Sequence, residues 1–184
     1  HVWHAYRAEH YVLKDISFAL EPGSTLAIVG YTGSGKSSLI GLINRLYHFE
    51  KGEILIDGVD IKKYDPFYLR SRIAVVLQDV FLFSGSVKDN VTLRNPDISP
   101  DRIKQAASLI GIDDFIERLP GGYDFNVRER GAMLSLGQRQ LLSFLRALLY
   151  DPAILVLDEA TSSLDSESEA LIQQALKRVM AGRT

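Results

Sequence analysis

The feature that most constrains the fold is a glycine-rich octapeptide, Gly30-Tyr31-Thr32-Gly33-Ser34-Gly35-Lys36-Ser37. It follows an apolar stretch, residues 25–29, that predicts a β-strand, and it leads into apolar residues at helical spacing that predict a helix from about 35 to 47. A strand, a glycine-rich loop and a helix in this order are typical of a phosphate-binding loop (P-loop). The sequence therefore predicts an α/β domain built around this loop.

The residue types in the loop suit a triphosphate. Glycines let backbone N–H groups close around phosphate oxygens, and the helix N-terminus adds the positive end of its dipole. Lys36 is predicted to pair with the β- and γ-phosphates, and the Ser37 hydroxyl to ligate Mg²⁺. The predicted ATP-binding residues of the loop are Gly30, Thr32, Gly33, Ser34, Gly35, Lys36, Ser37 and Ser38.

A second motif is an apolar run, 154–157, that ends in Asp158 and Glu159. Downstream of a P-loop, this pattern predicts a buried strand whose first acid holds Mg²⁺ at the carboxyl end of the sheet. Glu159 is then placed to polarise an attacking water and is the predicted catalytic carboxylate. Taken alone, such a pattern also fits an ordinary solvated strand end.

The remaining pattern gives the fold class. Alternating apolar residues at 16–20 predict another strand, Asp57-Gly58 predicts a hairpin turn, and 73–77 predicts a buried strand. Residues 80–131 show no strand pattern, and Ser99-Pro100 opens a helix within them. We expect a P-loop NTPase (RecA-like) α/β fold, with a mostly parallel sheet core, an antiparallel β portion and a helical subdomain. We expect one domain over 1–184, its nucleotide-binding core formed by 1–79 and 147–184 and its helical subdomain by 80–146.

Composition excludes several classes of protein. The net charge of -2 gives no general attraction to nucleic acid, and the absence of cysteine excludes a disulfide framework. The longest apolar runs are far shorter than the ~20 residues that span a bilayer, so a membrane anchor would have to lie outside this chain. The histidines at 1, 4, 10 and 48 show no spacing typical of metal ligands.

The class of NTPase is indicated by Leu134-Ser135-Leu136-Gly137-Gln138-Arg139-Gln140. This segment resembles the signature sequence of ABC ATPases, where the residues from Leu134 to Gln138 act in trans on ATP held by a second nucleotide-binding domain. The resemblance therefore implies a homo- or heterodimer. The commoner form of the motif has glycine where this chain has Leu136.

Further matches extend the resemblance over most of the chain. Tyr6 is similar to the aromatic residue on which adenine stacks, although Trp3 and Tyr11 compete for this role. Gln78 resembles the Q-loop glutamine, which is a catalytic residue and a Mg²⁺ ligand in the family. A third match, Ser163-Leu164-Asp165, is similar to the D-loop that links the two ATP sites; an N-cap for the last helix is the alternative.

Two segments resemble the exporter branch of the family. One is 80–87 after Gln78, and the other is 127–131, which is similar to the X-loop except that Arg128 stands where glycine is usual. The resemblance implies a transmembrane domain as partner and a location on the cytoplasmic face of a membrane, as in a bacterial inner membrane. The family also has a further strand and a switch histidine beyond the position of Thr184, so we expect the domain to continue past this residue.

These observations lead us to expect the ATP-binding and ATP-hydrolysing domain of an ABC exporter, with ATP and Mg²⁺ bound and no nucleic-acid partner. ABC ATPases that act on DNA carry long coiled coils between the two nucleotide motifs, and no heptads occur here. A nucleotide-binding module without hydrolysis is disfavoured by Glu159, and a P-loop kinase would leave the signature segment unexplained. The transported substrate is not encoded in these motifs.

Overall fold

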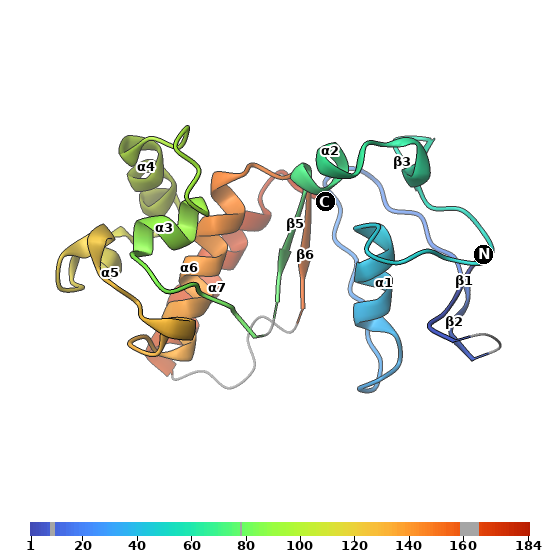
Figure 1. Ribbon diagram of the computed structural model, residues 1–184, viewed down its shortest axis with the longest axis horizontal. Coiled ribbons are helices and arrows are strands. Elements are labelled where there is room, and N and C mark those ends of the chain that lie inside the picture. Colours follow the sequence, from blue (N-terminus) through green and yellow to red (C-terminus); the bar gives the residue numbers. More distant parts are fainter. Residues whose placement is uncertain (8–9, 78, 159–165) are drawn as a thin grey trace. The chain divides into compact units, whose positions relative to one another are not determined.

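A computed structural model describes residues 1–7, 10–77, 79–158 and 166–184. The chain forms two compact units, His1–Ile73 together with Thr184, and Ala74–Arg183 (Figure 1). The predicted lobes, 1–79 with 147–184 and 80–146, were defined by their expected role in nucleotide binding, whereas the two units are defined by contacts within the chain. The lobes remain a prediction.

The first unit combines two antiparallel strand pairs with two helices. Its elements are β1 (Val2–Ala5), β2 (Tyr11–Ile16), α1 (Lys36–Ile43), β3 (Leu55–Ile56), β4 (Val59–Asp60), the 3₁₀ turn η1 (Ile61–Lys63) and α2 (Pro66–Ser71). β1 pairs with β2, His4 lying opposite Leu13, and β3 pairs with β4. The predicted helix after the P-loop is confirmed but ends earlier than expected, because Arg45 takes a positive φ of 52° directly after the cap residue Asn44.

Local sequence signals explain the hairpin and the second helix. Asp57 and Gly58 have φ values of 50° and 74°, and two central residues with positive φ are what a type I′ hairpin turn requires. Asp65 caps α2 by accepting a hydrogen bond from the Tyr68 N–H at 2.9 Å, while Pro66 occupies the first turn. The predicted hairpin and the predicted short helix are therefore confirmed.

The strands predicted at 16–20 and 25–29 are wrong. β2 ends at Ile16, and no strand is assigned between residues 17 and 29, all of which the structure describes. Leu26, Ile28 and Val29 are 41%, 46% and 93% exposed. Apolar alternation shows that a segment suits a strand, but a ladder also needs a neighbour for its backbone N–H and C=O groups, and β2 takes β1 instead. The apolar alternation at 16–20 begins at the last residue of β2 and continues into a segment without a strand.

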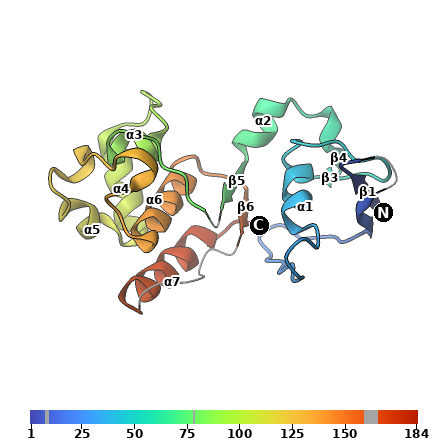
Figure 2. The same ribbon diagram turned by 60° about the horizontal axis from the view of Figure 1, so that its bottom comes forward.

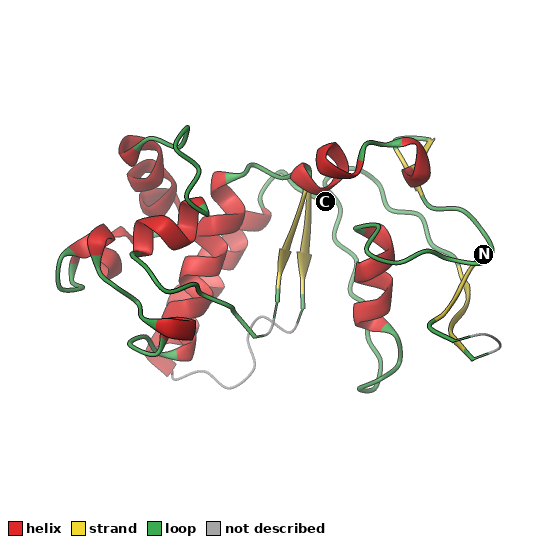
Figure 3. Cartoon of the chain, in the orientation of Figure 1, coloured by secondary structure: helices red, strands yellow, loops and turns green. Residues whose placement is uncertain are grey.

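The second unit is built around the helix α6. Its elements are β5 (Ile73–Val76), α3 (Val87–Thr92), α4 (Pro100–Ile110), α5 (Asp113–Glu117), the 3₁₀ turns η2 (Gly122–Asp124) and η3 (Glu129–Gly131), α6 (Leu136–Leu149), β6 (Ile154–Leu157) and α7 (Ser166–Met180). β5 pairs with β6, and the two strands run in the same direction (Figure 3). Along the chain, the helices α3 to α6 lie between these two strands. The expectation of a mainly helical stretch between two strands is confirmed, but their predicted burial is only partly so: Ile73 and Val76 of β5 are buried, whereas the residues of β6 are half-buried.

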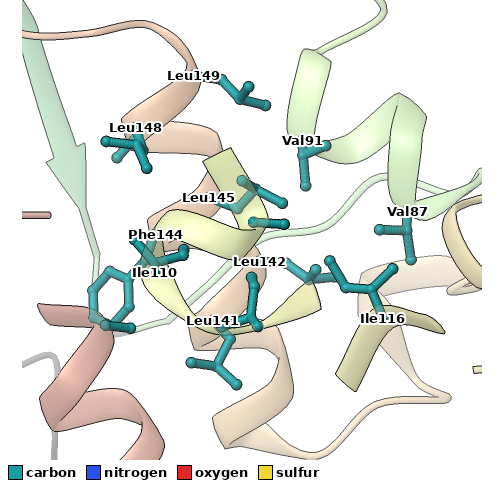
Figure 4. Packing of buried hydrophobic residues seen from close by; sticks show 14 of the residues in the cluster. Val87, Val91, Ile110, Ile116, Leu141, Leu142, Phe144, Leu145, Leu148 and Leu149 are labelled. Atoms are coloured by element: carbon teal, nitrogen blue, oxygen red, sulfur yellow. The ribbon is translucent and has the colours of Figure 1, made fainter. Parts of the chain in front are cut away.

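The core of the second unit lies around α6. Leu141, Leu142, Phe144 and Leu145 of this helix are at most 2% exposed. They meet side chains that α3, α4 and α5 point toward them, including Val91 and Ile116 (Figure 4). Burying a side chain of this size contributes about 1.5–3 kcal/mol each, so α6 is the element on which the unit depends.

On its other side α6 contacts α7 (Figure 2). α7 contributes Ile172, Ala175 and Val179, which are fully buried at the spacing of one helix face. Among the described helices, none has both the length and the apolar character that crossing a bilayer would require.

Candidate functional site

The P-loop takes the backbone conformation that its glycines allow. Gly33 and Gly35 have φ values of 82° and 98°, in a region that costs other residues free energy. A Cβ on Gly35 would also lie only 2.7 Å from a methyl group of Leu13, whereas Gly33 has open space around it. The Ser34 N–H donates to the Tyr31 carbonyl at 3.0 Å and closes the turn. Residues 30–34 of the loop are exposed, whereas Gly35 is buried.

Lys36 holds this loop at the start of α1. Its ammonium donates to the carbonyl oxygens of Gly30 and Tyr31 at 2.8 and 3.2 Å. The cap residue of α1 is Gly35, and among the described residues no side chain caps this helix. Glycine has no side chain to cap the start of α1, and a helix N-terminus of this kind suits an anion.

Of the other predicted loop residues, Thr32, Ser34 and Ser37 are exposed, while Ser38 is buried at 7% exposure. The predicted adenine-stacking residue, Tyr6, is linked to Ser38: its hydroxyl donates to Ser38 Oγ at 2.9 Å, and its side chain stays 53% exposed. The structure therefore brings Tyr6 to the P-loop helix.

The two competing aromatic residues lie elsewhere in the first unit. Trp3 and Tyr11 pack against each other with ring centroids 5.2 Å apart. The Lys51 ammonium lies 5.5 Å from the Trp3 ring and 5.7 Å from the Tyr11 ring. This arrangement favours Tyr6 over Trp3 and Tyr11 for the predicted role.

The signature segment forms the beginning of α6. Ser135 is the N-cap: its Oγ accepts from the Gln138 N–H at 3.2 Å, and Gln138 Oε1 accepts from the Ser135 N–H at 3.0 Å. Leu134 and Gly137 are buried, Leu136 is half-buried, and Ser135 is exposed. Capping uses a lone pair of the serine oxygen, and the hydroxyl proton stays available for another acceptor. The N-cap interpretation and an anion-binding role are thus compatible.

Asp158 directly follows β6, and its N–H donates to the Val76 carbonyl of β5 at 2.9 Å. The backbone that carries this carboxylate is therefore fixed by the β5–β6 pair. Glu159, Gln78 and the predicted D-loop residues Ser163, Leu164 and Asp165 lie outside the described residues.

The two segments that resemble exporter loops are joined to each other. Ser86 and Asn126 form an isolated antiparallel bridge, the Val87 N–H donates to the Phe125 carbonyl at 2.9 Å, and the Val127 N–H donates to the Gly85 carbonyl at 3.0 Å. A displacement of one segment would therefore also displace the other or break these backbone hydrogen bonds.

A buried asparagine and an arginine hold the first of these segments. Asn90, 1% exposed, accepts from the Phe83 N–H at 2.7 Å and donates to the carbonyls of Phe83 and Ser86. Arg146 of α6 donates to the carbonyls of Asn90 and Phe81, and burial lowers the pKa of its guanidinium. Phe81 and Phe83 remain 50% and 55% exposed, so an exposed aromatic pair lies on a segment that these hydrogen bonds hold in place.

Sequence reasoning missed Asn90, Arg146 and a buried histidine, His4. A single polar residue within an otherwise helical or strand-like pattern carries no local signal of the bonds it makes. Among the described residues no group of three or more His, Asp and Glu side chains could hold a metal ion.

The ABC transporter family profile matches residues 13–162. The chain is 49% identical over 180 residues to an uncharacterized ABC transporter ATP-binding protein, YknV, of Bacillus subtilis, covering 98% of this chain and 30% of that protein. It is 48% identical to a probable multidrug resistance ABC transporter ATP-binding/permease protein, YheH, of the same organism, covering 98% of this chain and 27% of that protein.

Among solved structures, a bacterial Atm1-family ABC exporter with ATP bound matches the whole chain with a TM-score of 0.90 and 39% identity, over 32% of that protein's chain. The chain therefore spans about a third or less of each of these proteins.

Proposed function

The chain belongs to the ABC transporter family, and from this premise we propose that it is the ATP-binding and ATP-hydrolysing domain of an exporter. ATP-binding domains of this family are ATPases, and the expected P-loop NTPase fold is confirmed by the match to an ABC exporter. The observation that carries the proposal is the P-loop, in which Lys36 and the start of α1 present positive charge and N–H groups to one exposed turn.

The P-loop fits a triphosphate on the evidence of its own bonds. The Lys36 ammonium is now satisfied by two backbone carbonyls, and exchanging these for phosphate oxygens replaces neutral acceptors with charged ones, which are stronger. The open turn around Gly33 leaves the backbone accessible to a bulky anion. We therefore assign phosphate binding to Lys36, the loop amides and the first turn of α1.

The predicted metal ligands also fit the chemistry of Mg²⁺. Ser37 offers a hydroxyl and Asp158 a carboxylate, and Mg²⁺ is usually held by one or two such oxygens together with substrate phosphates. When bound, it would neutralise charge on the phosphate oxygens. We propose that Gln78 completes the ligand set and that Glu159 orients the attacking water and accepts its proton.

We propose that the signature segment acts on ATP bound by a second nucleotide-binding domain. Ser135 is exposed at the start of α6, where its hydroxyl proton and the N–H groups of the first turn would contact a γ-phosphate. Gly137 is buried in the same turn, so the motif is part of a fixed helix start. In this proposal the D-loop residues Ser163, Leu164 and Asp165 link the two ATP sites.

A relative of this chain is an ATP-binding/permease protein of an ABC transporter, and a similar solved structure is an ABC exporter. We propose that this chain likewise works with a transmembrane domain, on the cytoplasmic face of a membrane, and that the Phe81–Phe83 pair and residues 127–131 contact it. A DNA-acting ABC ATPase fits less well, since the longest helices described, α6 and α7, have 14 and 15 residues and leave no room for a coiled coil.

Light scattering on the Glu159→Gln variant tests the composite site. Since this change should stop hydrolysis but keep ATP bound, we expect the mass to double on adding Mg-ATP. The double variant with Lys36→Ala should stay monomeric, because it lacks the phosphate-binding ammonium. If Glu159→Gln binds Mg-ATP and still stays monomeric, the proposal that Ser135 acts in trans within a pair of these chains is wrong.

A further inference from the structure

His4 lies in an environment that does not use its polarity. The side chain is 3% exposed, and among the described residues neither Nδ1 nor Nε2 has a hydrogen-bond partner. The nearest carboxylate oxygen, Glu50 Oε2, is 3.8 Å from Nδ1, beyond hydrogen-bond distance, and it accepts instead from the Ala5 N–H at 3.1 Å. A buried polar group without a partner costs free energy, so the ring must contribute through its shape and its aromatic faces.

The ring packs against two tyrosines. The His4 and Tyr6 centroids are 4.8 Å apart with the rings at 78°, and Tyr47 and Tyr6 are 5.2 Å apart at 88°. His4 and Tyr47 stack on each other at 5.9 Å and 28°. Tyr6 is thus nearly perpendicular to two rings that are close to parallel. Edge-to-face contacts of this kind are the arrangement that aromatic pairs prefer.

Both ends of this cluster are attached to α1, the helix that the P-loop opens into. A Cβ on Gly41 would lie 2.7 and 2.8 Å from Cδ2 and Cε2 of Tyr47, so the Tyr47 ring rests directly on the backbone of α1. At the other end, the Tyr6 hydroxyl donates to Ser38 Oγ at 2.9 Å, one turn earlier on the same helix. The position of the Tyr6 ring is therefore defined relative to the loop that binds phosphate.

We propose that His4 and Tyr47, here called the aromatic brace, are positioning residues for the nucleotide. The brace holds the exposed Tyr6 ring at a fixed separation from Lys36 and the loop amides, so that adenine and triphosphate are bound together without reordering the protein. Such preorganisation lowers the entropy cost of binding. The inference rests on the proposed binding of ATP and on Tyr6 as the stacking residue, and it adds residues that do not touch the nucleotide.

A role in core packing alone would have a different signature. Inorganic tripolyphosphate carries the phosphate chain but no base, and it probes the P-loop without Tyr6. Loss of the brace should weaken binding of Mg-ATP and leave binding of Mg-tripolyphosphate unchanged, whereas general damage to the first unit would weaken both.

The experiment measures the dissociation constants of both ligands by calorimetry for wild type, His4→Ala, His4→Phe, Gly41→Ala and Tyr6→Ala. An aromatic pair contributes enough that we expect His4→Ala and Gly41→Ala to weaken Mg-ATP binding roughly two- to tenfold, and tripolyphosphate binding by less than about twofold. His4→Phe should bind Mg-ATP as wild type does, because it keeps a ring, and should unfold at an equal or higher temperature, because it removes two unpaired nitrogens.

Tyr68→Ala is the matched control. The exposed fraction of Tyr68, 57%, is similar to that of Tyr6, 53%. Its ring, however, stacks on Tyr64, with the centroids 6.2 Å apart. This variant should leave both dissociation constants unchanged.

The outcomes separate the inference from the function on which it rests. If wild type binds neither ligand, the proposed nucleotide site fails and the inference fails with it. Wild-type ATP affinity in Tyr6→Ala would show that Tyr6 is not the stacking residue and would overturn both assignments. If Tyr6→Ala weakens Mg-ATP alone but His4→Ala and Gly41→Ala change both ligands equally, or neither, then the nucleotide site stands and the brace is refuted.

Discussion

At the scale of single residues, Arg128 has a strained backbone. Its φ of 61° and ψ of -176° fall in a region that is essentially restricted to glycine. In the exporter X-loop that this segment resembles, glycine is usual at this position. The buried Val127 and the Arg128 N–H, which donates to Asn126 Oδ1 at 2.9 Å, hold the chain in this conformation. The strain is therefore imposed by the neighbouring contacts.

We predict that Arg128→Gly stabilises the protein. Relieving strain of this kind stabilises the folded state by about 1–3 kcal/mol. The greater freedom of glycine in the unfolded chain offsets about 0.5–1 kcal/mol of this gain. The free energy of unfolding should rise by about 1 kcal/mol in urea denaturation. Arg130→Gly is the control, since Arg130, at φ 53° and ψ 21°, lies in the milder left-handed helical region; its gain should be smaller. An unchanged or lower stability for Arg128→Gly would show that the side chain compensates for the strain.

At the scale of elements, α3 and α6 begin with the same device. In each, a serine N-cap and the residue three positions later exchange side-chain and backbone hydrogen bonds: Ser86 with Asp89, and Ser135 with Gln138. In α6 the second partner is neutral. In α3 it is a carboxylate, and hydrogen bonds from the Ser86 backbone and side chain lower the pKa of Asp89, with smaller contributions from Arg94 and Lys88.

This difference predicts a pH dependence for α3. Because the folded pKa of Asp89 is depressed, its contribution is complete above the unfolded value of about 3.9 and is lost as pH falls through the lower folded value. Asp89→Asn should cost about 1 kcal/mol at pH 7, as loss of a cap does, and the difference from wild type should shrink below about pH 4. Urea denaturation across this range measures it. Gln138→Ala should instead cost the same amount at every pH, and a pH-independent cost for Asp89→Asn would contradict the argument.

The elements also show which parts of the fold the sequence could predict. The Asp57-Gly58 turn, the Asp65-Pro66 helix start and β6 follow from signals within a few residues, and all three are found in the structure. The stretch 25–29 was predicted as a strand from its apolar pattern, yet whether it joins a sheet depends on a partner strand that no local pattern specifies. β1 was missed because four residues at the chain start show too short an alternation.

In the candidate site, too, residues in contiguous motifs could be predicted, whereas contacts between residues distant in sequence could not. Lys36 and Ser135 could be proposed as site residues because each belongs to a contiguous motif that forms its own geometry at a helix start. Tyr6 could be proposed but not chosen over Trp3 and Tyr11, since the deciding bond to Ser38 joins residues 32 positions apart. His4 gave no signal at all, because a histidine in a strand is usually read as a surface residue.

At the scale of the whole molecule, the apolar core and the proposed nucleotide site are unevenly distributed between the two units. The large apolar cluster belongs to the second unit, where α6 alone supplies Leu141, Leu142, Phe144 and Leu145. In the first unit, residues 25–34 are exposed, and Val29 and Tyr31 are 93% and 92% accessible to solvent. The first unit, which carries Lys36, thus has a smaller apolar core than the second unit. A ligand bound to the first unit should therefore add most to the stability of that unit.

Ligand linkage turns this into a prediction for the whole protein. A ligand that binds only the folded state at 100 times its dissociation constant adds about 2.7 kcal/mol, and 1 kcal/mol raises the unfolding temperature by about 2–4 °C in a chain of this length. Saturating Mg-ATP should therefore raise the midpoint by about 5–10 °C. Trp3, the chain's one tryptophan, lies in the same unit as Lys36 and reports the transition by fluorescence. Lys36→Ala should abolish the shift because it removes the ammonium that we propose binds phosphate, while leaving the protein folded. An equal shift in Lys36→Ala would mean that ATP stabilises the chain at a place other than the P-loop.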